Sequence, residues 1–66
     1  MQIYVNGAPR TLPEPMGLMT LLLEMGLAGK RVAVEINHEI VPRAHHGDRV
    51  LRDGDRIEIV QAIGGG

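Results

Sequence analysis

One segment of helical periodicity lies between two segments that alternate as β strands do, and this arrangement limits what the chain can fold into. In residues 2–5 the strongly apolar side chains recur at every second position, which predicts a strand. Asn6-Gly7 follows and predicts a tight hairpin into a short strand over 10–12. The run Pro13-Glu14-Pro15 cannot pair in a ladder, so we expect the second strand to end there.

The helical segment covers residues 17–25. Its apolar side chains follow the spacing of one helical face, and we expect them all to lie in the core. They are Leu18, Met19, Leu22, Leu23 and Met25. The start lacks a capping Ser, Thr, Asp or Asn, whereas Gly26 or Gly29 can end the helix in a left-handed conformation.

The second half returns to a period of two residues and ends in a strand. We expect a strand over 32–36, a turn over 37–39, an extended piece over 40–41 that Pro42 ends, a loop over 43–47, a short strand over 49–52, a turn over 53–55 and a last strand over 56–63. In that last strand Ile57 and Ile59 point to the core. The order of elements predicts an α+β fold, with one main helix packed on a mixed four- to five-stranded sheet.

Size and composition exclude several classes of function. A chain of 66 residues makes one domain with no room for a deep substrate cavity. The net charge of −1 and a single aromatic residue, Tyr4, argue against nucleic acid as a partner. No apolar run has the roughly 20 residues of a membrane helix, and the N-terminal residues do not resemble a signal peptide. The absence of cysteine excludes a disulfide framework and is compatible with a reducing cytosol, so we expect a cytoplasmic protein. We also expect the protein to be monomeric on its own.

The C-terminal glycines contribute little to the stability of the fold, since glycine loses the most backbone entropy on ordering. Gly64, Gly65 and Gly66 follow Ile63 directly. We expect a β-sheet domain over 1–63 and a flexible tail over 64–66 that can enter a narrow channel in a partner and present the carboxylate of Gly66 there. Extended, three residues reach about 10 Å.

A docking patch is expected beside this tail. If Ile57 and Ile59 face the helix, Val60 and Ala62 lie on the opposite face of the strand, and Ile63 leads into the glycines. Small apolar patches of this kind are typical of interaction surfaces, although isolated exposed valines are also ordinary.

No set of residues indicates catalysis or a metal site. His38, His45 and His46 are interpreted as surface side chains, and there is neither cysteine nor serine to pair with them. Asp53 and Asp55 flank Gly54 as turn residues do. The arginines are interpreted as a solvated set: Arg31, Arg43, Arg49, Arg52 and Arg56. We therefore expect a protein-borne cosubstrate that is not itself an enzyme.

Four segments together resemble the ThiS family of sulfur carriers in thiamine biosynthesis. They are VAVEIN (32–37), IVPR (40–43), GDRIEIV (54–60) and AIGGG (62–66). The similarity covers the whole chain, and it implies a ubiquitin-like β-grasp fold. One departure is Gly64, where the family often has alanine, and it leaves the diglycine intact.

The resemblance also implies a reaction at Gly66. An adenylating enzyme of the ThiF type would activate the carboxylate with ATP, and sulfur from a cysteine desulfurase would convert the adenylate to a thiocarboxylate. Thiazole synthase (ThiG) would then use that sulfur. The chain itself would hold no cofactor, and the partner would consume the ATP.

Two other functions remain open from the sequence. A carrier for molybdopterin synthesis or transfer-RNA thiolation would share the fold, the tail and the activation chemistry. A ubiquitin-like modifier would join its terminal glycine to lysines of other proteins. A third possibility is an interaction domain whose glycines have no chemical role.

Overall fold

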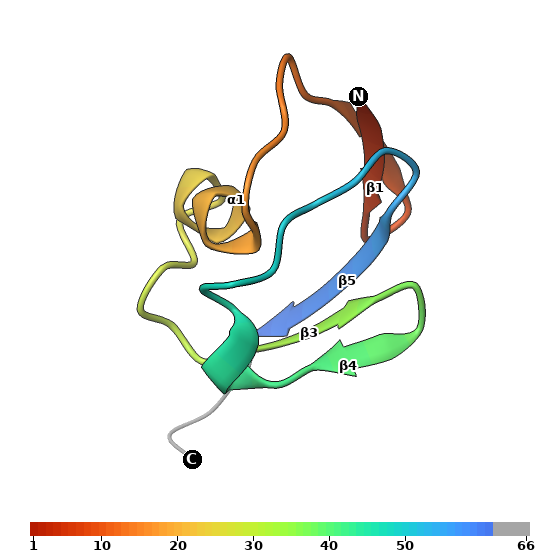
Figure 1. Ribbon diagram of the computed structural model, residues 1–66. Helices are drawn as coiled ribbons and strands as arrows, with labels where there is room; N and C mark the ends of the chain where they lie inside the picture. The colour runs from red at the N-terminus through yellow and green to blue at the C-terminus, as the bar shows by residue number, and fades with distance from the viewer. Residues whose placement is uncertain (62–66) are drawn as a thin grey trace.

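The computed structural model describes residues 1–61, which form five strands, one α-helix and one 3-10 helix. Their bounds are β1 Gln2–Val5, β2 Ala8–Thr11, α1 Leu18–Glu24, β3 Val32–Ile36, β4 Glu39–Val41, η1 Arg43–His45 and β5 Arg56–Gln61. The helix lies on one face of the sheet (Figure 1). Ala62, Ile63 and the three glycines, and with them the expected boundary between domain and tail, lie outside the described residues.

The five strands form one mixed sheet in the order β2-β1-β5-β3-β4. β1 pairs with β5 in parallel, and the other three neighbours are antiparallel. The last strand therefore lies at the centre of the sheet and joins the N-terminal hairpin to the hairpin of β3 and β4. This arrangement confirms the predicted α+β fold and its β-grasp topology.

Two hairpin turns set the register of the outer strands. Asn6 and Gly7 have φ angles of 50° and 84°, as the predicted two-residue turn requires. The second turn was expected over three residues, and this was wrong: it consists of Asn37 and His38, with φ angles of 54° and 68°. Ile36 is consequently opposite Glu39 and begins the pairing of β3 with β4. A two-residue turn is favoured because its twist matches that of the strands it joins.

Helix α1 buries a different set of side chains from the one expected. Leu18, Leu21 and Leu22 are buried, at the i, i+3 and i+4 positions of one face. Leu21 is 0% exposed whereas Leu23 is 66% exposed, and Met19 is also exposed. The expected placement of Leu23 and Met19 in the core was therefore wrong, because five neighbouring apolar residues occupy more of the helix than a single sheet face can cover.

The core lies between α1 and the sheet. Its strand residues alternate with exposed ones, as the period of two predicted. The core consists of Ile3, Val5, Leu12, Leu18, Leu21, Leu22, Val34, Ile36, Leu51, Ile57 and Ile59. Burying a Leu, Ile or Val side chain is favourable by about 1.5–3 kcal/mol, which offsets the ordering cost of so small a chain.

Three other segments differ from the expectation. The second strand begins at Ala8, because the two-residue turn places Ala8 opposite Val5. Residues 43–45 form a 3-10 turn inside the expected loop. Residues 49–52 do not form a strand; Val50 makes only an isolated bridge to Gly17, while Leu51 enters the core.

In the part of the chain that the structure describes, no helix is long and apolar enough to cross a membrane.

Candidate functional site

The last described residues form β5, the central strand of the sheet. β5 pairs with all five residues of β3, from Ile57 opposite Ile36 to Gln61 opposite Val32. On its other side the parallel ladder with β1 ends at Val5 opposite Ile57. The position of Gln61, the last described residue, is thus set by the β3–β5 pairing.

The side chain of Asn6 continues the pairing of β5 where β1 stops. Its Oδ1 accepts a hydrogen bond of 2.8 Å from the amide of Ile59, and its Nδ2 donates one of 3.2 Å to the carbonyl of Ile59. The hairpin residue Asn6 therefore fixes β5 two residues before the end of the described chain.

A buried carboxylate fixes the other end of β5. Asp55 accepts hydrogen bonds from the Nδ2 of Asn37 at 3.0 Å and from the amide of Arg52 at 2.8 Å, and its Oδ2 lies 3.5 Å from the Arg49 guanidinium. The Oδ1 of Asn37 accepts a bond of 3.0 Å from the amide of Arg56. Interpreting Asp55 as only a turn residue and Arg49 as fully solvated was wrong, because both belong to this network.

The face of the sheet that points away from α1 carries the one predicted docking residue that the structure describes. Val60 is 66% exposed and lies opposite Ala33. Two residues along each strand on this same face, Glu35 of β3 lies directly opposite Glu58 of β5. Ile40 of β4 lies opposite Glu35 and is 76% exposed. We call Ala33, Glu35, Ile40, Glu58 and Val60 the outer sheet patch.

Ile40 was missed in the sequence because its face depends on the length of the preceding turn. With three turn residues Ile40 would point to the core, whereas the observed two residues turn it outward. The signal was available in Asn37, since asparagine tolerates the positive φ angles of such turns.

At the other side of the same face, the Arg56 guanidinium lies 4.9 Å from the ring centroid of Tyr4, a cation–π contact.

The remaining predicted site residues lie outside the described residues. They are Ala62 and Ile63 of the docking patch, Gly64 and Gly65 of the tail, and Gly66, the residue expected to be modified. Their roles stay predictions.

The three histidines do not form one group. His38 occupies the exposed turn, and His45 lies on the surface with its Nδ1 3.6 Å from Asp48. His46, by contrast, is only 7% exposed, so its interpretation as a surface side chain was wrong. Its Nε2 donates to the carbonyl of Val41 at 3.0 Å, which holds η1 against the end of β4. Within residues 1–61, no group of three or more His, Asp or Glu side chains could hold a metal ion.

Comparisons with known proteins agree with this geometry. The family model of the ThiS family matches residues 3–66. The chain is 44% identical over 64 residues to the sulfur carrier protein ThiS of Thermus thermophilus, covering 97% of this chain and 98% of that protein. It superposes on the crystal structure of the thiamine biosynthesis protein ThiS from Geobacter metallireducens with a TM-score of 0.83, at 33% identity and with full coverage of both chains.

A longer relative contains the same domain. The thiazole synthase of Paramagnetospirillum magneticum is 42% identical over all 66 residues, and the chain spans 20% of the length of that protein. Because a family model covers nearly the whole chain, and because the sheet order and the solved structure agree with it, this chain belongs to the ThiS family.

Proposed function

We propose that this protein is the sulfur carrier of thiamine biosynthesis, and that it carries sulfur as a thiocarboxylate on Gly66. The observation that carries the proposal is the family match, which extends through residue 66 and so includes all three glycines. The near-complete mutual coverage with the Thermus thermophilus sulfur carrier supports it.

The chemistry follows from the properties of a carboxylate. An ionised carboxylate is a poor electrophile but can attack the α-phosphorus of ATP, with pyrophosphate as the leaving group. The resulting acyl-adenylate is reactive because AMP leaves readily. The outer sulfur of a persulfide then displaces AMP, and a thiol cleaves the S–S bond to leave the thiocarboxylate. The first step belongs to a ThiF-type enzyme and the sulfur comes from a cysteine desulfurase, so the carrier itself needs no bound cofactor.

The folded body has two tasks in this scheme. It must supply most of the binding energy, since ordering a glycine segment on a partner costs entropy. It must also hold firm the strand from which the terminal segment continues, and the pairing of β5 with β3 and the Asn6–Ile59 bonds support this role. The outer sheet patch offers exposed apolar side chains for docking, at Val60 and Ile40.

Thiazole synthase is the proposed acceptor of the sulfur. In Paramagnetospirillum magneticum a protein of that name contains a segment similar to this entire chain. Two functions carried by one polypeptide in one organism often act together when they are separate in another, which supports direct contact between this carrier and a thiazole synthase. Because the route consumes ATP, we place the protein in the cytoplasm.

The decisive experiment is the intact mass of the protein isolated from its native cells, with fragmentation to localise any change. A mass increase equal to the replacement of one oxygen by sulfur, at Gly66, is expected. Deleting Gly66 should abolish adenylation by the cognate enzyme, whereas the exposed-helix variant Leu23→Ala should be adenylated normally. An unmodified terminus in cells that are making thiamine, together with no adenylation in vitro, would refute the proposal.

The pathway is tested separately by gene deletion. A requirement for thiazole supports the thiamine route, whereas loss of molybdoenzyme activity or of transfer-RNA thiolation would assign the same chemistry to another acceptor. Gly66 found joined to a lysine of another protein would instead indicate a modifier.

A further inference from the structure

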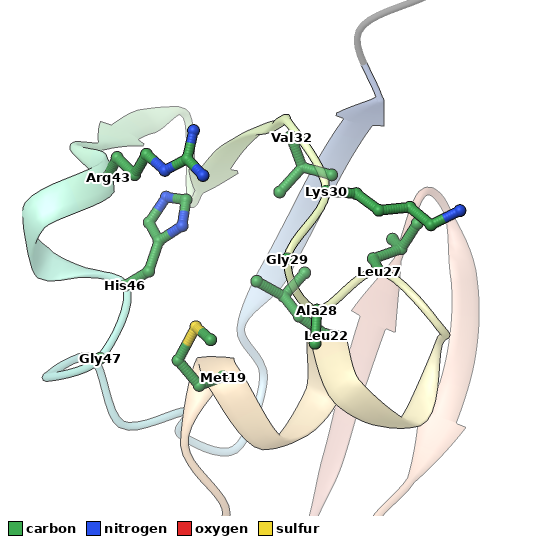
Figure 2. Close-up of a pocket in the computed structure, with 10 residues that line it drawn as sticks. All are labelled: Met19, Leu22, Leu27, Ala28, Gly29, Lys30, Val32, Arg43, His46 and Gly47. Carbon is green, nitrogen blue, oxygen red and sulfur yellow. The ribbon is translucent and has the colours of Figure 1, made fainter.

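A cavity of about 270 Å³ opens on the helix side of the molecule, away from the outer sheet patch. Its apolar wall is formed by Leu22 of α1, Leu27 after the helix and Val32 at the start of β3, with the exposed Met19 at the edge. Figure 2 shows Leu22 and Val32 across the opening from Arg43 and His46, with Met19 beside His46.

The rim of the cavity is basic. Arg43 comes from η1 and its guanidinium lies beside the His46 ring, whereas the side chain of Lys30, from the segment before β3, extends away from the opening (Figure 2). No Asp or Glu is among the residues that line the cavity, although the chain has eight acidic and seven basic residues. Within residues 1–61, neither cation takes part in an ion pair. The local charge therefore suits a carboxylate.

His46 adds a hydrogen-bond acceptor to the apolar wall and the basic rim. Since the carbonyl of Val41 can only accept, the Nε2 of His46 carries the hydrogen of their 3.0 Å bond, and Nδ1 of the neutral ring has a free lone pair. Figure 2 shows the ring against the cavity between Arg43 and Met19. Among the described residues Nδ1 has no hydrogen-bond partner, so this edge of the ring can accept an N–H from an occupant.

The chemistry of the lining, and not its size, indicates the occupant. The volume of about 270 Å³ lies just below the range of about 300–1,000 Å³ for pockets that hold drug-sized ligands. The cavity has room for one aliphatic side chain with a neighbouring polar group. A peptide segment supplies all three complementary groups: an aliphatic side chain for the wall, a carboxylate for the rim and a backbone N–H for His46.

We propose that this cavity is a second docking site, which binds a segment of a partner protein in which an aliphatic residue adjoins an aspartate or glutamate. The wall contacts the aliphatic side chain, Arg43 pairs with the carboxylate, and His46 Nδ1 accepts a backbone N–H. The cavity is lined by side chains of α1 and lies on the opposite side of the sheet from the outer sheet patch, so a partner bound here leaves that patch accessible. A second protein can thereby bind at the outer sheet patch at the same time.

The test is a titration of the full-length, ¹⁵N-labelled protein with acetyl-Leu-Glu-methylamide, followed by amide chemical shifts. We expect shifts confined to residues 27–32 and 43–47. The matched peptide acetyl-Leu-Gln-methylamide, which lacks only the charge, should bind about two- to fivefold more weakly, the range for solvent-accessible ion pairs. A third arm uses 4-methylpentanoate, which has the apolar group and the carboxylate but no N–H; it should bind more weakly than the Leu-Glu peptide.

Variants connect the binding to the rim. The variant Arg43→Gln should weaken the Leu-Glu peptide at least about twofold and remove its advantage over Leu-Gln. The control removes one charge from an exposed residue outside the cavity, Arg52→Gln, and should bind as the unaltered protein does. Shifts elsewhere, equal binding of the two peptides, or equal loss in both variants would overturn the proposal. Tighter binding of free 4-methylpentanoate than of the peptide would assign the cavity to a small molecule and overturn it as well. None of these outcomes depends on the chemistry at Gly66.

Discussion

Asn6 and Ile59 are 53 residues apart in sequence and are joined by two hydrogen bonds that reproduce one step of a β ladder. The amide group of the Asn6 side chain substitutes for a backbone amide at the point where β1 has turned into its hairpin. One residue thus serves both the turn, through its positive φ, and the central strand, through its side chain. The end of β5 is stabilised on both sides for this reason.

Asn6→Gly should destabilise the fold by about 1–3 kcal/mol. Glycine keeps the positive φ angle, but the two bonds to Ile59 are lost, each worth roughly 0.5–1.5 kcal/mol. The control is His38→Gly, a positive-φ residue without a side-chain hydrogen bond in residues 1–61, which should be neutral or slightly stabilising. Urea unfolding measures both. Equal effects of the two substitutions would show that the side chain of Asn6 contributes nothing.

Three consecutive leucines of α1 should respond to truncation by very different amounts. Leu21→Ala should cost about 2–5 kcal/mol, and Leu22→Ala the same, because both side chains are buried in the core. Leu23→Ala should cost less than about 1 kcal/mol, since that side chain is 66% exposed. Thermal and urea unfolding decide the matter, and a large loss at Leu23 would contradict the observed helix face.

Glu58→Gln should stabilise the protein. Glu58 and Glu35 are directly opposed across β5 and β3, and no ion pair within residues 1–61 involves either carboxylate. Removing one of two like charges at this spacing should raise the free energy of unfolding by about 0.2–1 kcal/mol. The gain should shrink at high salt, which screens exposed charges.

A matched variant checks that the effect comes from the pair. Glu39→Gln removes an exposed charge from β4, where the residue lies opposite the apolar Ile36. Little change is expected there. If both variants gain the same stability, net charge is responsible and the opposition of Glu35 and Glu58 is not.

Val60→Asp should impair activation by the cognate adenylating enzyme while leaving the fold intact. A charge at the centre of a docking patch should lower kcat/KM about tenfold, equivalent to 1.4 kcal/mol, if Val60 becomes buried on binding. Val50→Asp is the control, because Val50 is also an exposed valine but lies outside the outer sheet patch. Pyrophosphate release measures the rate. Unchanged activation of the Val60 variant would remove this residue from the interface.

Local patterns in the sequence were sufficient for the class and order of elements. Alternation at residues 2–5 and 32–36, helical spacing at 17–25 and the Asn6-Gly7 turn each depend on a few consecutive residues. These signals predicted one helix on a mixed sheet, with Ile57 and Ile59 facing inward, and the structure agrees. The family resemblance was also carried by short segments.

What failed were predictions that depend on two distant segments at once. Five apolar residues near each other on α1 do not reveal that the sheet covers Leu21 and leaves Leu23 exposed. The mostly polar residues around His46 in the sequence do not show that its side chain is buried against Val41. In each case burial is decided by the neighbour that a side chain meets, and that neighbour comes from another part of the chain.

The sequence by itself determined that the chain forms one small α+β domain and that it belongs among sulfur carriers, because periodicity and motif are properties of adjacent residues. Only the tertiary structure decided which surfaces are available for partners. The two-residue turn at Asn37 and His38 brings Ile40 to the outer face with Val60, and the bond from His46 to Val41 holds η1 so that Arg43 lies at the cavity. Both depend on register and packing between segments, which side-chain periodicity within one segment does not encode.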